Sequence, residues 1–160
     1  MSRPFGEQLA ALAARLEIAR PDLGDEHARW ALYAAALGRA EEWPVVLELL
    51  GSEPVQPVVA AVVVRALEVV PPARRPDFVA ALPEGRDRRY AATRARELAI
   101  LDAFAAGDGP EFAEHWSTWL QLRAATTIGV PATLEALATA GATKRIRAAA
   151  GDRLRNIRPG

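Results

Sequence analysis

The sequence predicts an all-α protein of about nine helices in antiparallel pairs. Apolar residues recur at the three- and four-residue spacing of a buried helix face along most of the 160-residue chain. Glycine or proline follows most of these apolar segments closely, as is typical of helix ends. One valine-rich run could form a strand, but no second run exists with which it could pair. Because the length is that of one ordinary domain, we expect a single all-α domain over residues 1–160.

The first two helices are indicated by apolar spacing and by the residues that follow them. Apolar residues between positions 9 and 16 share one helical face, and Pro21 should end that helix. The second helix should cover residues 25–37 and bury Trp30. Gly38 follows directly, so we expect it to end the helix in the left-handed conformation.

The valine-rich run decides the fold class. A third helix should begin near Glu41 and end at Gly51, and residues 55–72 follow. The β-branched side chains of that run favour a strand. Its length, its flanking prolines and the position of Pro57 in a first turn favour a helix with two apolar faces. We predict a buried helix, because a lone strand could not satisfy its backbone hydrogen bonds.

The remaining part of the chain divides into five further helices. Asp108 and Glu111 have the spacing of a capping box, so one helix should start at Pro110 and end near Ile128, before Gly129. The expected ranges are 76–82, 87–106, 110–128, 131–140 and 142–156.

A regular spacing links the second helices of successive pairs. Leu37, Leu67, Leu98 and Ile128 are separated by 30, 31 and 30 positions. A period of this size is typical of a helix–turn–helix unit that stacks into an α-solenoid. We therefore expect a short solenoid, whose second helices line a concave surface.

Composition excludes several classes of protein. Hydrophobic residues make up 51% of the chain and charged residues 25%, as in ordinary globular domains. The formal net charge is zero, so the long-range attraction to phosphate that most nucleic-acid binders have is absent. Arginine supplies nineteen of the twenty basic residues and alanine is abundant, which is typical of a GC-rich bacterial genome.

The sequence favours a cytoplasmic location. Cysteine is absent, which is compatible with a reducing compartment. Charged residues interrupt the first twenty positions, which therefore fit an amphipathic helix better than a signal peptide. Arg65 and Glu68 likewise interrupt the valine-rich run, so we expect no transmembrane segment.

Two segments resemble the HEAT-like helical repeat. In Val46–Pro54 a leucine-rich helix end is followed by an acidic and proline-containing turn, and the next helix contains Arg65-Ala66-Leu67. Residues 133–154 look like a second copy. The resemblance implies a short HEAT-like α-solenoid that binds a partner.

A narrower resemblance is to the bacterial EboA-like family, which is found with secondary-metabolite gene clusters. Gly129-Val130-Pro131-Ala132 and the basic helix that runs to Arg158 follow the order of that family's C-terminal part. Residues 65–71 are similar to its central stretch. Membership would imply a role in handling or moving a natural-product intermediate.

The candidate binding residues are aromatic and cationic side chains at helical spacing. On the expected helix 110–128, His115, Trp119 and Arg123 follow one another at intervals of four, and Thr126 continues the same face. Such a line suits a groove for a peptide or small molecule. Alternatively, Trp119 and the nearby Trp116 belong to the core, and Arg123 extends past them to water. The full set of ligand-binding candidates is Tyr33, Tyr90, Arg94, His115, Trp119 and Arg123.

No catalytic signature, metal site or cofactor is indicated. His27 and His115 have no further strong ligands at metal-binding or triad spacing. Glu111 and His115 lie one turn apart and could form half a metal site, or simply a surface pair. Gly107 and Gly109 precede an expected helix, but the strand and third glycine of a phosphate-binding loop are missing.

The sequence leaves three functions open. The first is a non-catalytic module that holds a protein, peptide or small-molecule partner on its concave face. The second is an enzyme or carrier of natural-product biosynthesis with a pocket around the 110–128 helix. The third is nucleic-acid binding as in HEAT-like alkylpurine glycosylases, but no carboxylate is placed to match that family's site. Its basic residues would be Arg86, Arg88, Arg89, Arg94, Arg96, Lys144, Arg145 and Arg147.

Overall fold

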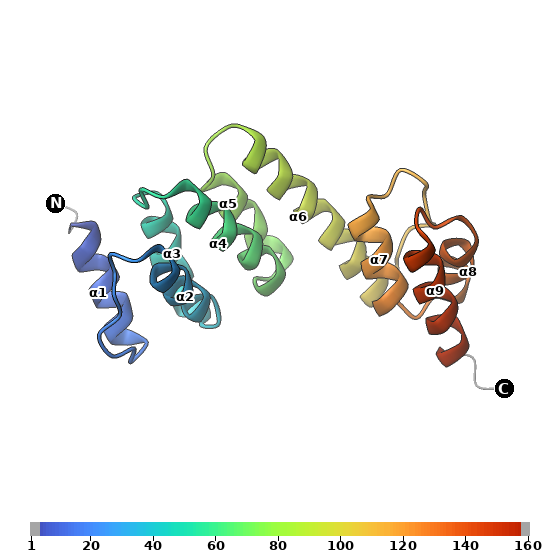
Figure 1. The fold of residues 1–160 in the computed structure, drawn as a ribbon, viewed down its shortest axis with the longest axis horizontal. Helices are drawn as coiled ribbons and strands as arrows, with labels where there is room; N and C mark the ends of the chain where they lie inside the picture. The colour runs from blue at the N-terminus through green and yellow to red at the C-terminus, as the bar shows by residue number, and fades with distance from the viewer. Residues whose placement is uncertain (1–3, 158–160) are drawn as a thin grey trace. The chain divides into compact units, whose positions relative to one another are not determined.

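The protein is all-α. A computed structural model describes residues 4–157, and this part of the chain forms nine α-helices and two short 3-10 turns without any strand (Figure 1). Arg158, the end of the basic helix considered above, lies outside the described residues. Packing divides the chain into two compact units, Met1–Arg96 and Glu97–Gly160, which are described separately. The expectation of a single domain stays a prediction.

The first unit contains five helices and the start of a sixth. α2 packs along α4, α3 contacts α1 and α2, and α5 packs on α4. No helix in residues 4–157 has the length and apolar character needed to cross a bilayer. The helices are α1 (Phe5–Arg15), α2 (Glu26–Leu37), α3 (Trp43–Leu50), α4 (Gln56–Val69), α5 (Arg75–Ala80) and α6 (Arg86–Ala105), with 3-10 turns at Ala40–Glu42 and Pro72–Arg74.

The valine-rich run is a helix, as predicted. Pro57 lies in the first turn of α4, where its missing N–H interrupts no helical hydrogen bond. Val59, Val63 and Ala66 are each at most 1% exposed, so the run forms the buried centre of the first unit. Burial of branched side chains among neighbouring helices therefore outweighs their preference for strands.

The first helix ends earlier than expected, at Arg15 and not near Pro21. Glu17 adopts a left-handed conformation with φ of 59°. The Ile18 N–H donates to the Ala13 carbonyl and the Glu17 N–H to the Ala14 carbonyl, which is the closing pattern of a Schellman motif. The expectation for Gly38 was also wrong, because it ends α2 with a right-handed φ of −71°.

The buried face of α2 differs from the predicted one. Trp30 is 41% exposed, whereas Arg29 and Tyr33 are buried. The prediction that Trp30 is buried was therefore wrong. Arg29 lies on the same buried face as Leu32, Tyr33, Ala36 and Leu37, where it forms an ion pair, and Trp30 falls outside that face.

That ion pair joins Arg29 of α2 to Glu53, in the turn between α3 and α4. The Arg29 Nη2 donates to Glu53 Oε1 at 2.9 Å, and Nε donates to both carboxylate oxygens. Tyr33 donates its hydroxyl proton to Glu53 Oε2 at 3.1 Å, and the Val55 N–H donates to Oε1. Hydrogen bonding to Glu53 raises the pKa of Arg29, and burial raises the pKa of Tyr33. The turn between α3 and α4 is thereby fixed to α2.

The second unit contains the end of α6 and three further helices. α9 packs on both α8 and α7. Phe104 of α6 and Phe112 each meet the Trp116 ring edge to face, at centroid distances of 6.1 and 5.6 Å. The helices are α7 (Thr118–Thr127), α8 (Pro131–Ala140) and α9 (Lys144–Ile157).

The expected helix 110–128 is wrong in its first part. Helix α7 begins only at Thr118, and Asp108 does not cap it. Instead the Asp108 N–H donates to the Ala103 carbonyl and helps to close α6, with Gly107 in the left-handed region at φ 82°. A Cβ on Gly109 would lie 2.0 Å from the Phe104 ring, so the loop packs too closely there for any other residue.

Removing the charge of Glu53 should destabilise the first unit strongly. In Glu53→Gln the buried Arg29 guanidinium loses its counter-ion, and we expect a loss of about 3–5 kcal/mol in the free energy of unfolding. Urea denaturation followed by circular dichroism measures this loss. The exposed Glu41→Gln serves as control, and an equally small effect of both substitutions would contradict a structural role for the ion pair.

A second ion pair should make stability depend on pH. The Arg15 Nη2 donates to Glu42 Oε2 at 2.8 Å, and this hydrogen bonding holds the pKa of Glu42 below its ordinary value. A carboxylate whose pKa is lowered by folding stabilises the folded protein fully at pH values above the ordinary carboxyl pKa of about 4.3. This stabilisation is lost as the pH falls below that value. We expect Glu42→Gln to be about 1 kcal/mol less stable than wild type at pH 7. Urea titrations at several pH values should show this stability difference shrinking below about pH 4. A stability difference that does not change with pH would contradict the prediction.

Candidate functional site

The structure places the six predicted binding residues in different surroundings. Tyr33 has no exposed surface, because its side chain belongs to the buried ion-pair network of the first unit. Tyr90 and Arg94 lie on α6 in the first unit. His115 is an exposed loop residue of the second unit, outside α7, so it does not share a helix face with Trp119. Tyr33 therefore does not lie on a binding surface, and the convergence of the other five residues on a single surface stays a prediction.

Tyr90 and Arg94 form a pair one helical turn apart. The Arg94 Nη2 donates to the Tyr90 hydroxyl at 2.9 Å, and the guanidinium carbon lies 5.5 Å from the ring centroid. Tyr90 is 52% exposed and Arg94 is 8% exposed. The arginine therefore holds the ring at the surface from beneath.

Trp119 and Arg123 do come together, in a pocket between α7 and α9. The Arg123 guanidinium carbon lies 5.7 Å from the Trp119 ring centroid, a cation–π arrangement. The pocket has a volume of about 280 Å³. Its lining residues are Trp119, Leu122, Arg123, Thr126, Arg145 and Ala149.

Sequence reasoning missed the α9 side of this pocket. Arg145 and Ala149 lie one turn apart on α9, and together they face the predicted residues of α7. Arg145 was recognised only as part of a basic cluster that could contact phosphate. A pattern within one helix cannot reveal which second helix completes a pocket, so this contribution needed the tertiary structure.

The α7/α9 pocket carries cationic hydrogen-bond donors beside an indole. Two guanidinium groups supply planar, permanently charged donors that match a carboxylate or phosphate. The Thr126 hydroxyl donates within its own helix, with the Leu122 and Arg123 carbonyls each at 3.0 Å. The lining holds no carboxylate or imidazole that could act as a general base.

Two polar side chains, Gln121 and Arg153, link α7 to α9. Gln121 is 2% exposed. Its side-chain N–H donates to the Trp116 carbonyl at 2.7 Å. Its side-chain oxygen accepts from the N–H of Ala142, just before α9, at 2.9 Å. At the other end of α7, the Arg153 Nε donates to the Ile128 carbonyl at 3.0 Å. The two walls of the pocket are therefore positioned before any ligand arrives, which reduces the entropic cost of binding.

The beginning of α7 is fixed by a side-chain cap. The Ser117 hydroxyl accepts from the Leu120 N–H at 3.1 Å and donates to the carboxylate of Glu97. Serine satisfies a backbone donor that the first helical turn would otherwise leave without a partner. The cap lies two residues before Trp119, so the indole belongs to a helical turn whose start is fixed.

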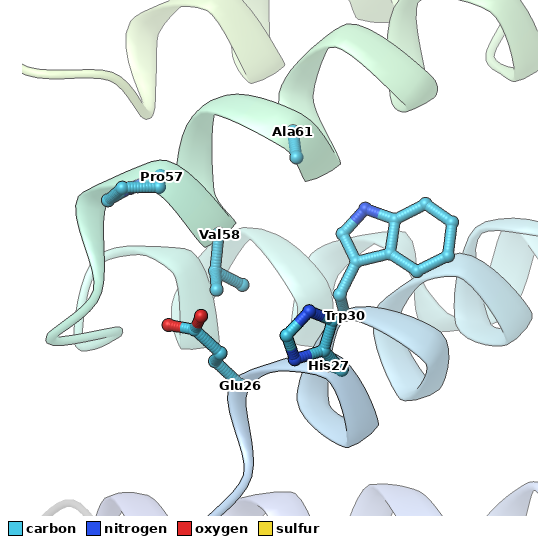
Figure 2. Close-up of a pocket in the computed structure, with 6 residues that line it drawn as sticks. All are labelled: Glu26, His27, Trp30, Pro57, Val58 and Ala61. Atoms are coloured by element: carbon cyan, nitrogen blue, oxygen red, sulfur yellow. The ribbon is translucent and has the colours of Figure 1, made fainter.

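A second pocket lies in the first unit, between α2 and α4 (Figure 2). Its volume is about 180 Å³, and the exposed Trp30 forms one wall. The remaining lining residues are Glu26, His27, Pro57, Val58 and Ala61. In residues 4–157 no three His, Cys, Asp or Glu side chains gather closely enough to hold a metal ion.

Comparisons with known proteins give no match. No protein-family model matches the chain, and no curated protein and no solved structure shows significant similarity to it. The candidate sites are therefore defined by their geometry alone.

Replacing Gln121 should loosen the link between α7 and α9. In Gln121→Met the Trp116 carbonyl and the Ala142 N–H lose their partner while the side-chain volume is nearly kept. We expect the free energy of unfolding to fall by about 1–3 kcal/mol, measured by urea denaturation. Gln56→Met, at the exposed start of α4, is the control; a loss no larger than that of the control would show that the Gln121 contacts do not fix the helices.

Proposed function

We propose that the protein is a non-catalytic binding module whose α7/α9 pocket holds an acidic, partly apolar segment of a protein or peptide partner. The observation that carries the proposal is the arrangement of Trp119, Arg123 and Arg145 around one preformed pocket.

The charge of the pocket favours an acidic partner. Arg123 and Arg145 are exposed at its rim, and no acidic side chain lines it. A carboxylate can accept two parallel hydrogen bonds from one guanidinium, which gives direction as well as attraction. The potential at the pocket also accelerates encounter with an acidic segment.

The apolar part of the pocket favours a partner with a hydrophobic anchor. Trp119 and Leu122 are partly buried and form a surface next to Ala149. Tryptophan and arginine are the residues most often found at the energetic centre of interfaces. An aliphatic or aromatic side chain between acidic residues would use both features of the pocket.

The biological setting that we propose rests on the sequence resemblances and on composition. A short HEAT-like α-solenoid, similar to EboA-like proteins, would serve as a cytoplasmic scaffold in a bacterial secondary-metabolism pathway. The alternative is a carrier or enzyme for a carboxylated natural-product intermediate in the same pocket. The absence of a general base in the lining favours the scaffold.

A titration with an acidic peptide tests the proposal. The probe is a short fluorescein-labelled peptide in which glutamates flank a leucine and a phenylalanine, and fluorescence anisotropy reports its binding. We expect Arg145→Ala to weaken binding by about two- to fivefold. Trp119→Ala should weaken it more, because the indole supplies the apolar contact. Arg155→Ala, which removes an exposed arginine from the same helix but outside the pocket, should leave affinity nearly unchanged.

Three outcomes would contradict the proposal. Equal effects of Arg145→Ala and Arg155→Ala would show that only net charge matters. Competition by N-acetylglutamate as strong as by the peptide would favour the small-molecule carrier. Tighter binding of a DNA oligonucleotide than of the peptide, with a steep decrease as salt rises, would favour nucleic-acid recognition.

A further inference from the structure

The α2/α4 pocket of the first unit shares no residue with the α7/α9 pocket, and its chemistry is the opposite. Glu26 and Trp30 lie one turn apart on α2, so both side chains fall on the same helix face. Figure 2 shows the Glu26 carboxylate near Val58 and Pro57 and the Trp30 indole at the other end of the pocket. No lysine or arginine lines it.

The chain shows elsewhere how its surface aromatic rings are accommodated. On α6 and α7 an arginine follows the aromatic residue by one turn, and its guanidinium lies over the ring at 5.5 or 5.7 Å. The corresponding positions around Trp30 hold Glu26 on one side and Ala34 on the other. Helix α2 therefore has an alanine where the other two helices supply a cation, and it places a carboxylate four positions before the ring.

We propose that the α2/α4 pocket binds an arginine side chain of a basic, partly apolar segment of a partner protein. The guanidinium would stack on the Trp30 indole and pair with the Glu26 carboxylate, while its methylene groups would contact Val58 and Ala61. A planar guanidinium fits an aromatic face better than the compact ammonium of lysine does.

The charge around the pocket supports this occupant. Asp25 precedes Glu26, and the hydrogen bond from the Ala28 N–H to its carboxylate lowers the pKa of Asp25. Both acids lie at the start of α2, together with His27, whose Nδ1 is 3.6 Å from Asp25 Oδ1. Residues 1–68 contain six basic and ten acidic residues, whereas the first unit as a whole, residues 1–96, has no net charge, so the attraction to a basic partner is local to the part of the unit that forms the pocket.

The exposure of Trp30 is the second supporting observation. Its side chain is 41% exposed although α2 packs along α4 directly beside it. A large aromatic side chain at the edge of a surface pocket, with a charged group within reach, is typical of an interface centre. The pocket is small, which fits one side chain with its flanking backbone and not a folded domain.

An NMR titration with matched peptides tests the inference. The probes are acetylated, amidated peptides of alanine and leucine with a central arginine, lysine, citrulline or glutamate. The readout is the indole N–H resonance of Trp30, identified by its loss in Trp30→Phe. We expect the arginine peptide to shift this resonance saturably and to bind about two- to fivefold more tightly than the citrulline peptide, which has the same shape without the charge. The lysine peptide should bind less tightly than the arginine peptide.

Matched variants separate the site from general charge effects. Glu26→Gln should weaken binding of the arginine peptide by about two- to fivefold, whereas Glu41→Gln, which removes an exposed acid elsewhere in the unit, should not. Equal affinity for the arginine and citrulline peptides, or a shift of the Trp119 resonance in place of Trp30, would overturn the proposal. So would the same Trp30 shift on raising protein concentration without peptide, because the occupant would then be a second copy of the chain.

Discussion

The buried ion pair between Arg29 and Glu53 determines the arrangement of the first unit. A charged pair is stable inside a protein only when hydrogen bonds satisfy it, and here Tyr33 and the Val55 N–H complete the coordination of the carboxylate. Arg29 lies on the buried face of α2 together with Leu32, Tyr33, Ala36 and Leu37, and Trp30 lies outside that face. The α2/α4 pocket is therefore a consequence of how the core is held together, and the aromatic wall of that pocket rests on a rigid support.

In the second unit, one buried glutamine has the corresponding role. Gln121 donates to the loop before α7 and accepts from the backbone just before α9, so one side chain links three segments. Trp119, two positions earlier, follows the orientation that these bonds impose. Because these bonds already hold the two helices in place, little conformational entropy is lost in ordering the pocket walls when a ligand binds.

The sequence predicted the fold better than the sites. Valine-rich α4 could be assigned because helix length and the lack of a strand partner outweigh local propensity. Helix α7 was extended too far because Asp108 and Glu111 have capping-box spacing, whereas the packing of Gly109 on Phe104 keeps that segment a loop. Trp30 was assigned to the core because hydrophobicity alone ignores a buried arginine, and the partner of that arginine is 24 positions away. Trp119 and Arg123 were found because one helical turn separates them; Arg145 was not, because it lies on another helix.

Under the two binding proposals, pockets of opposite charge on separate units would let a chain of zero net charge select its partners. The first unit offers a carboxylate beside an indole and the second offers two guanidiniums beside an indole. On these proposals each pocket would disfavour the ligand proposed for the other. Linking two weak contacts in one partner raises the apparent affinity without any new contact, provided that the connecting segment can span the two sites. Each pocket alone therefore needs only modest affinity, as expected for shallow pockets at the protein surface.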